Sequence, residues 1–108
     1  MILVASGRED IVASRDALCF VKNGCPRMSR VTGTGCMATE LLAAFLAVAS
    51  GEAVFHAAVV ATAFMGIAGE IAEETAPRGS GSYHIALIDA LSTMTAEDIA
   101  GRISVGEA

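Results

Sequence analysis

The first third of the chain alternates short apolar runs with turn residues. The runs ILVAS, IVAS and ALCFVK are separated by glycine and charged residues, and the last one ends at the turn pair Asn23-Gly24. Runs of this length are typical of strands. SRVT, residues 29–32, is a fourth extended candidate, so the pattern predicts strands over about residues 1–31.

The period of the apolar positions changes after Thr34. Apolar side chains then recur at the spacing of one helix face, and they are Met37, Leu41, Ala44, Phe45 and Val48. This spacing predicts a helix over about residues 34–49 that packs through that face.

A second helix is predicted over about residues 52–75. Its central part, residues 53–69, carries no charged residue and is apolar on every side, which is typical of a helix buried in a protein or in a membrane. The uncharged part falls short of the roughly 20 residues that cross a bilayer core, and basic flanking residues are missing. We therefore expect a buried helix and no membrane.

A third helix is predicted over about residues 82–94, with Leu87, Ile88, Leu91 and Met94 on its apolar stripe. Thr95 is placed as the N-cap of one more short helix. Together these elements predict an α/β fold in a single domain, in which short N-terminal strands are followed by three or four helices.

Composition and charge narrow the classes of partner. The formal net charge is −5 and the pI is about 4.8, which argues against a protein that binds the nucleic-acid backbone. A mean hydropathy of +0.59 is high for a small soluble domain. We infer that part of the apolar surface is covered by something outside the chain or meets lipid.

The cysteines and histidines predict no metal site and no disulfide framework. Cys19, Cys25 and Cys36 are odd in number and lack the CxxC spacing of zinc ligands, so a reducing cytoplasm fits best. Cys19 is expected in the core and Cys25 in an exposed loop. His56 is expected in the core or at a helix interface. The N-terminus lacks the basic region of a signal peptide, so no targeting segment is expected.

The stretch VTGTGC, at residues 31–36, is the strongest candidate for chemistry. A strand that leads through glycines into a helix gathers unpaired backbone N–H groups at the positive end of the helix dipole, where an anion is stabilised. Gly33, Thr34, Gly35 and Cys36 would form this anion hole, and the same N–H groups would stabilise a Cys36 thiolate. The alternative is a tight turn with Cys36 as a small buried side chain, and the spacing alone does not separate the two. Walker A and dinucleotide fingerprints are both missing.

RVTGTGCMATELLAAFLAVA, the later GIAGEIAEE, and GSGSYHIALIDAL resemble the C-terminal part of the hydroxyethylthiazole kinase family, thiamine-salvage enzymes of the ribokinase-like superfamily. The resemblance implies transfer of the ATP γ-phosphoryl group to the hydroxyl of 4-methyl-5-(2-hydroxyethyl)thiazole, with Mg²⁺. It assigns Cys36 as the base or orienting group, where the wider superfamily has the aspartate of Gly-Ala-Gly-Asp. It also assigns Gly33 to the thiazole substrate and Ser6 to ATP.

The chain departs from that family in length. Family members are more than twice as long, and the resemblance implies that the ATP-binding arginine and the acidic magnesium ligands lie in the other part. We therefore expect a C-terminal fragment or split subunit whose sheet edge at residues 1–7 pairs with that N-terminal half, or a homo-oligomer, a trimer in this family. The alternative is a non-catalytic interaction module that has kept the fold.

Overall fold

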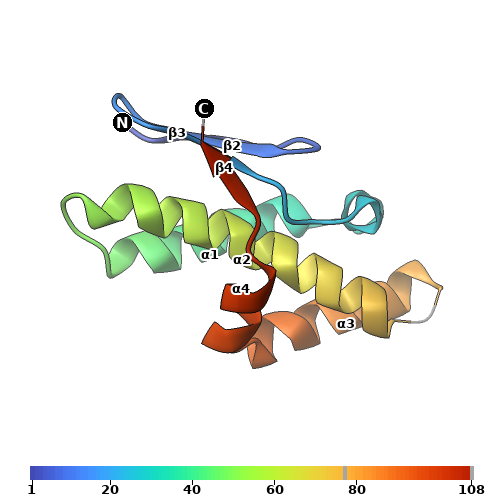
Figure 1. Cartoon of the computed structure of the whole chain (residues 1–108). Coiled ribbons are helices and arrows are strands. Elements are labelled where there is room, and N and C mark those ends of the chain that lie inside the picture. The colour runs from blue at the N-terminus through green and yellow to red at the C-terminus, as the bar shows by residue number, and fades with distance from the viewer. Residues whose placement is uncertain (77, 108) are drawn as a thin grey trace.

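A sheet layer lies on a helix layer in the computed structural model, which describes residues 1–76 and 78–107 (Figure 1). The sheet is antiparallel with strand order β1-β2-β3-β4, and its strands are Leu3–Ala5, Asp10–Ala13, Leu18–Val21 and Val105–Glu107. The first three strands follow the chain order because two short turns join them. The predicted α/β class is confirmed.

The helices lie together on one side of the sheet (Figure 1). A 3₁₀ helix, η1, is followed by four α-helices, and their bounds are Pro26–Arg30 for η1, Thr34–Ala47 for α1, Ala53–Thr75 for α2, Ser80–Thr93 for α3 and Ala96–Arg102 for α4. The long α2 is the centre of this layer, with α1 packed along one part of it and α3 along another.

The apolar centre of α2 is buried against two partners. Towards the sheet, Ala58, Ala63 and Ile67 pack on Val12 and Val21. Towards α3, a second cluster contains Met65, Ala68, Ala72, Tyr83, Leu87 and Ala90. This double packing explains why the α2 sequence is apolar on all sides. By length and composition α2 could cross a membrane, but 56% of its most apolar window is buried inside the protein, as in the core helix of a soluble protein.

Asn23 and Gly24 do not form the predicted turn. The chain instead runs on from β3 across α2, where Asn23 is buried. The Asn23 side-chain amide donates to Glu70 Oε2 at 2.9 Å and to the Arg102 carbonyl at 2.8 Å, and its Oδ1 accepts the Ser104 N–H at 2.8 Å. Contacts with residues far along the chain therefore replace the local turn.

The fourth predicted strand is also wrong. Most of SRVT lies in or directly after η1, whose first turn contains Pro26, and only its C-cap Val31 is extended. The true fourth strand is β4, at the other end of the chain, which pairs with β3 through Phe20 and Gly106. The sequence pattern missed β4 because three residues carry too little alternation to be recognised.

Two helix faces differ from the predicted stripes. On α3 the buried residues are Tyr83, Leu87 and Ala90, whereas Ile88 is 49% exposed. Val48 lies just beyond the end of α1 and is 90% exposed. The predicted N-cap Thr95 is confirmed, because its side chain accepts the Asp98 N–H at 3.2 Å and Asp98 accepts the Thr95 N–H at 2.9 Å.

Candidate functional site

A cavity of about 840 Å³ lies where the β1–β2 turn, the connection from β3 to η1, the start of α1 and the middle of α2 meet. The residues that matter for its chemistry are Ser6, Arg8, Asp10, Lys22, Thr34 and Gly35. It therefore brings the predicted ATP-contacting hydroxyl of Ser6 together with part of the predicted anion hole.

The helix α1 begins at Thr34, as the sequence predicts, but η1 and a turn precede it in place of the predicted strand. Gly33 is the N-cap residue with φ of +96°, a left-handed conformation that other residues rarely adopt. The Met37 N–H donates to the Gly33 carbonyl at 3.0 Å. Thr34, Gly35 and Cys36 form the first turn, in which backbone N–H groups have no intrahelical acceptor. These N–H groups are available to an anion.

The four predicted anion-hole residues divide into two pairs. Thr34 and Gly35 line the cavity, whereas Gly33 and Cys36 are not among the residues that line it. Cys36 is exposed, so the alternative of a small buried side chain is wrong for this structure. Its thiol is accessible at the third position of α1.

The β1–β2 turn is held by Asp10. The Gly7 N–H donates to Asp10 Oδ1 at 3.0 Å, which closes the turn that carries Ser6. Burial raises the pKa of the Asp10 carboxyl above its ordinary value, and the Gly7 hydrogen bond offsets part of this rise. The turn thus presents the exposed Ser6 hydroxyl to the cavity.

Two basic residues in the cavity wall, Arg8 and Lys22, are absent from the predicted site. Arg8 directly follows Ser6-Gly7, and Lys22 ends the predicted third strand. A basic residue at a strand end is a weak signal on its own. The fold brings Arg8 and Lys22 into the same cavity as the start of α1. There, both their positive charge and the free N–H groups of the helix favour an anionic ligand.

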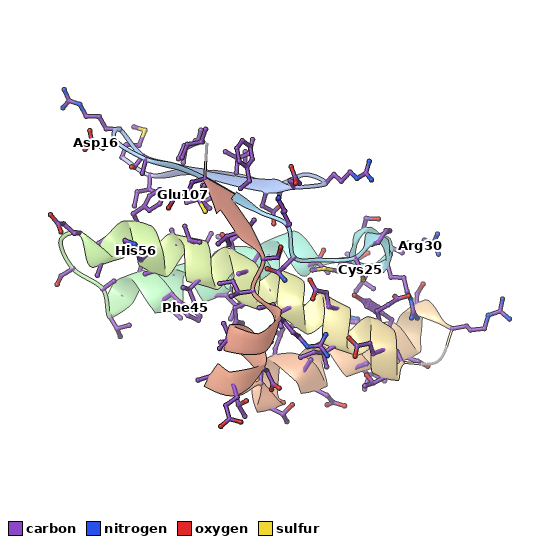
Figure 2. The ribbon with its side chains drawn as sticks, in the orientation of Figure 1. Asp16, Cys25, Arg30, Phe45, His56 and Glu107 are labelled. Atoms are coloured by element: carbon purple, nitrogen blue, oxygen red, sulfur yellow. The ribbon has the colours of Figure 1, made fainter. Side chains whose placement is uncertain are left out.

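Cys25 is half-buried, and the prediction of an exposed loop thiol is wrong (Figure 2). Its Sγ lies 3.0 Å from the Tyr83 hydroxyl and 3.4 Å from the Gly69 carbonyl, to which Tyr83 also donates at 2.9 Å. Burial first, and then the hydrogen bond with Cys25, raise the pKa of Tyr83. The Arg27 guanidinium lies 4.5 Å from the centre of the Tyr83 ring and forms an ion pair with Glu73 at 3.4 Å. Its charge therefore interacts with the Tyr83 ring and with Glu73.

The acidic and imidazole groups do not converge on an ion. Within residues 1–76 and 78–107, no group of three or more His, Cys, Asp or Glu side chains could hold a metal. His56 on α2 is exposed, contrary to the expected position in the core or at a helix interface (Figure 2).

Known proteins share both the sequence and the fold of this chain. The model of the hydroxyethylthiazole kinase family matches residues 1–97. Hydroxyethylthiazole kinase of Syntrophus aciditrophicus is 45% identical over 100 residues, which are 93% of this chain and 36% of that protein. The protein of the same name from Clostridium beijerinckii is 43% identical over 95 residues, 87% of this chain and 34% of that protein.

The solved structure of a hydroxyethylthiazole kinase protein from Pyrococcus horikoshii superposes on all of this chain, with a TM-score of 0.85 and 34% identity, and 41% of that structure is covered. This chain spans about a third of the length of the relatives it matches. The match over residues 1–97 includes the β1–β2 turn and the start of α1. The chain therefore belongs to the hydroxyethylthiazole kinase family.

Proposed function

We propose that this chain is the C-terminal part of a kinase that transfers the γ-phosphoryl group of ATP to the hydroxyl of 4-methyl-5-(2-hydroxyethyl)thiazole, in the supply of thiamine. The observation that carries the proposal is the start of α1, which opens with Thr34 and Gly35 onto the cavity that Ser6 also lines. The family to which the chain belongs supports the choice of substrates.

Phosphoryl transfer depends mainly on positioning and on stabilising charge at the transferred group. The N–H groups of the first turn of α1 provide hydrogen-bond donors at the positive end of a helix of 14 residues. Arg8 and Lys22 add positive charge from the wall of the same cavity. In this proposal the transferred phosphoryl lies at the start of α1, and the rest of ATP extends towards Ser6.

Cys36 is proposed to act on the attacking hydroxyl. Its thiolate accepts the hydroxyl proton while the hydroxyl oxygen forms a bond to the γ-phosphorus, and the bond between that phosphorus and the ADP oxygen breaks. Because Cys36 lies in the first turn of α1, its proton acceptor and the N–H donors for the phosphoryl are carried by the same rigid turn. The thiazole ring is placed near Gly33. The resemblance implies that Mg²⁺ would be held by acidic residues of the N-terminal part of the family's fold.

The complete enzyme is proposed to contain more than this segment. The matched relatives are about three times as long, so this chain works either as a piece of a longer polypeptide or together with a separate N-terminal part, in an assembly such as the trimer that the resemblance implies. The three cysteines, none of them in a disulfide, support a cytoplasmic location.

The test is phosphorylation of the thiazole alcohol with ATP and Mg²⁺. The chain is assayed alone and together with the part of a relative that lies outside the matched segment. We expect activity in the combined sample and a loss of about 10²- to 10⁴-fold in rate for Cys36→Ala, the usual contribution of a general base. Val48→Ala, just beyond the other end of α1, is the matched control. Absence of thiazole phosphorylation in both samples overturns the proposal, and a loss of less than a few-fold removes the role of Cys36.

A second candidate is a non-catalytic interaction module. It is favoured by one observation: Gly33 and Cys36 are not among the residues that line the cavity shared by Ser6, Thr34 and Gly35. The two candidates are separated by the genomic sequence before Met1. A coding segment for the N-terminal part of the family, in frame or in a neighbouring gene, supports the kinase, and its absence supports the module.

A further inference from the structure

Asn23 and Gly24 form a pair with a chemical reactivity of its own. Because a glycine has no Cβ atom, its backbone nitrogen can approach the side-chain amide of the asparagine before it. In this reaction the Gly24 nitrogen bonds to Asn23 Cγ, the Cγ–Nδ2 bond breaks, and ammonia leaves with the proton that the Gly24 nitrogen has lost. Water then opens the five-membered imide at one of its two carbonyls. Asn23 becomes an aspartyl or an isoaspartyl residue.

The fold holds the side chain that would react. Asn23 Nδ2 donates to Glu70 Oε2 at 2.9 Å and to the Arg102 carbonyl at 2.8 Å, and Asn23 Oδ1 accepts the Ser104 N–H at 2.8 Å. These hydrogen bonds connect the amide to α2 and to the segment between α4 and β4. Asn23 is 6% exposed, so water cannot readily replace these partners. The amide group is therefore fixed on both of its polar atoms.

The attacking nitrogen is held by the same carboxylate. The Gly24 N–H donates to Glu70 Oε2 at 2.9 Å, the oxygen that also accepts from Asn23 Nδ2. Attack on Cγ requires the Gly24 nitrogen to lose this proton, and a carboxylate is too weak a base to take it. The negative charge of Glu70 also opposes an anionic nitrogen beside it. Glu70 therefore restrains both groups that have to combine.

The packing of the main chain adds a second restraint. A Cβ atom at Gly66 would lie 2.5 Å from the Asn23 carbonyl oxygen and 2.8 Å from Asn23 Cβ, so Asn23 is in direct contact with the backbone of α2. Closure of the imide ring requires rotation of the Asn23 main chain or side chain. Such rotation pushes atoms against α2 or breaks the hydrogen bonds, so the segment has to leave the helix before it can react.

We propose that Asn23 is a deamidation site that Glu70 keeps unreactive in the folded protein and that reacts when the segment after β3 leaves α2. This inference does not depend on the proposed kinase activity. The product cannot return to the same position, because a carboxylate at residue 23 cannot donate to the Arg102 carbonyl and places a second negative charge against Glu70. Since Asn23 and Gly24 line the cavity, a transient opening becomes permanent damage to its wall.

The experiment follows the mass of the intact 108-residue chain. Deamidation replaces NH₂ by OH, and because Asn23 is the only asparagine and the sequence has no glutamine, the mass gain reports this residue alone. The chain is incubated in mildly alkaline buffer with and without concentrated guanidinium chloride. Wild type is compared with Glu70→Ala and with Glu73→Ala, the matched control, since Glu73 lies one turn further along α2 and pairs with Arg27. Circular dichroism establishes that each variant retains its helices.

We expect the wild type and Glu73→Ala to deamidate at least about a hundredfold more slowly in buffer than in denaturant, because the reaction waits for local opening. Glu70→Ala should react at least about tenfold faster than Glu73→Ala in buffer and at the same rate in denaturant. If Glu70→Ala loses its helices, Glu70→Asp, which withdraws the carboxylate by one methylene group, takes its place with the same expected result.

Three results overturn the proposal. They are equal rates for the folded and the unfolded wild type, an unfolded chain that gains no mass, and a folded Glu70 variant that reacts no faster than Glu73→Ala. The aspartyl product is tested directly as Asn23→Asp, which should gain no mass and should unfold at a lower denaturant concentration than the wild type. An equal unfolding midpoint for Asn23→Asp overturns the claim that the modified segment cannot close again.

Discussion

Gly66 on α2 lies directly against the backbone of Asn23, and a Cβ atom at Gly66 would be 2.5 Å from the Asn23 carbonyl oxygen. The segment after β3 therefore crosses α2 at a glycine, where no side chain blocks the close approach of the two backbones. This crossing carries the chain to Gly24 and Cys25, which line the cavity. The contact between Gly66 and Asn23 therefore belongs both to the packing of α2 and to the wall of the cavity.

Gly66→Ala is expected to destabilise the fold. The added methyl meets backbone atoms that cannot rotate away, so either α2 or the Asn23 segment has to shift, which costs about 1–3 kcal/mol as in other overpacked cores. Urea unfolding followed by circular dichroism measures the change. Gly101→Ala in α4 is the control, since a Cβ there meets nothing within 4 Å and should stabilise by about 0.5–1 kcal/mol. A midpoint for Gly66→Ala at or above that of the wild type would refute the close crossing.

The single tyrosine, Tyr83, is expected to lose its hydroxyl proton at a higher pH than an ordinary tyrosine. Burial and the hydrogen bond with Cys25 raise the pKa of Tyr83 above its ordinary value of 10.0. Since this protein has one Tyr and no Trp, the tyrosinate absorbance reports on Tyr83 alone. We expect no tyrosinate in the folded protein near pH 10, and its appearance only at higher pH or with unfolding. An ordinary titration curve in folded protein would contradict the buried position.

The same shift predicts a pH dependence of stability. The folded state holds the Tyr83 proton more tightly than the unfolded state, so the free energy of unfolding falls as the pH rises above the unfolded value near 10. Tyr83→Phe cannot ionise, so its free energy of unfolding should fall less than that of the wild type as the pH rises above 10. At neutral pH the variant should be less stable by roughly 1 kcal/mol, because it lacks the hydrogen bond to the Gly69 carbonyl. Urea midpoints across the alkaline range test both effects.

The three thiols are expected to react in the order of their exposure. Cys36 is exposed, Cys25 is half-buried beside Tyr83, and Cys19 is buried. Burial and the negative charge of Glu107 also raise the pKa of Cys19, which makes its reactive thiolate scarcer. A chromogenic aromatic disulfide should therefore give a fast, an intermediate and a slow phase. Cys36→Ser should remove the fast phase alone, and a fast phase that survives this change would contradict the exposure of Cys36.

Asp10→Asn is expected to stabilise the folded protein at neutral pH. The amide oxygen can still accept the Gly7 N–H, while the burial of a negative charge is relieved. Because the folded pKa of Asp10 is raised above 3.8, the folded wild type gains protons first as the pH falls, so the difference between the two proteins should disappear in acid. The measurement is the difference of urea midpoints at neutral and acid pH. A variant that is less stable at neutral pH would show that the Asp10 charge itself supports the turn.

Local interactions determined what could be predicted from the sequence. The strands before residue 22, the start of α1 at Thr34 and the helix capped by Thr95 all depend on contacts within a few residues, such as the Asp98 N–H bond to Thr95. The left-handed conformation of Gly33 was not predicted, although it too is a property of a single residue. The resemblance to hydroxyethylthiazole kinases rests on the order of such local motifs.

Tertiary contacts decided the remaining features. Asn23 and Gly24 look like a turn, yet Asn23 forms its hydrogen bonds with Glu70, Arg102 and Ser104, the last of them 81 residues away. Arg8 and Lys22 become part of one cavity only when two strand ends meet α1 and α2. Alternation along a strand marks both of its faces but does not show which neighbour covers each, and for that reason only the folded structure showed which face of the sheet packs on α2.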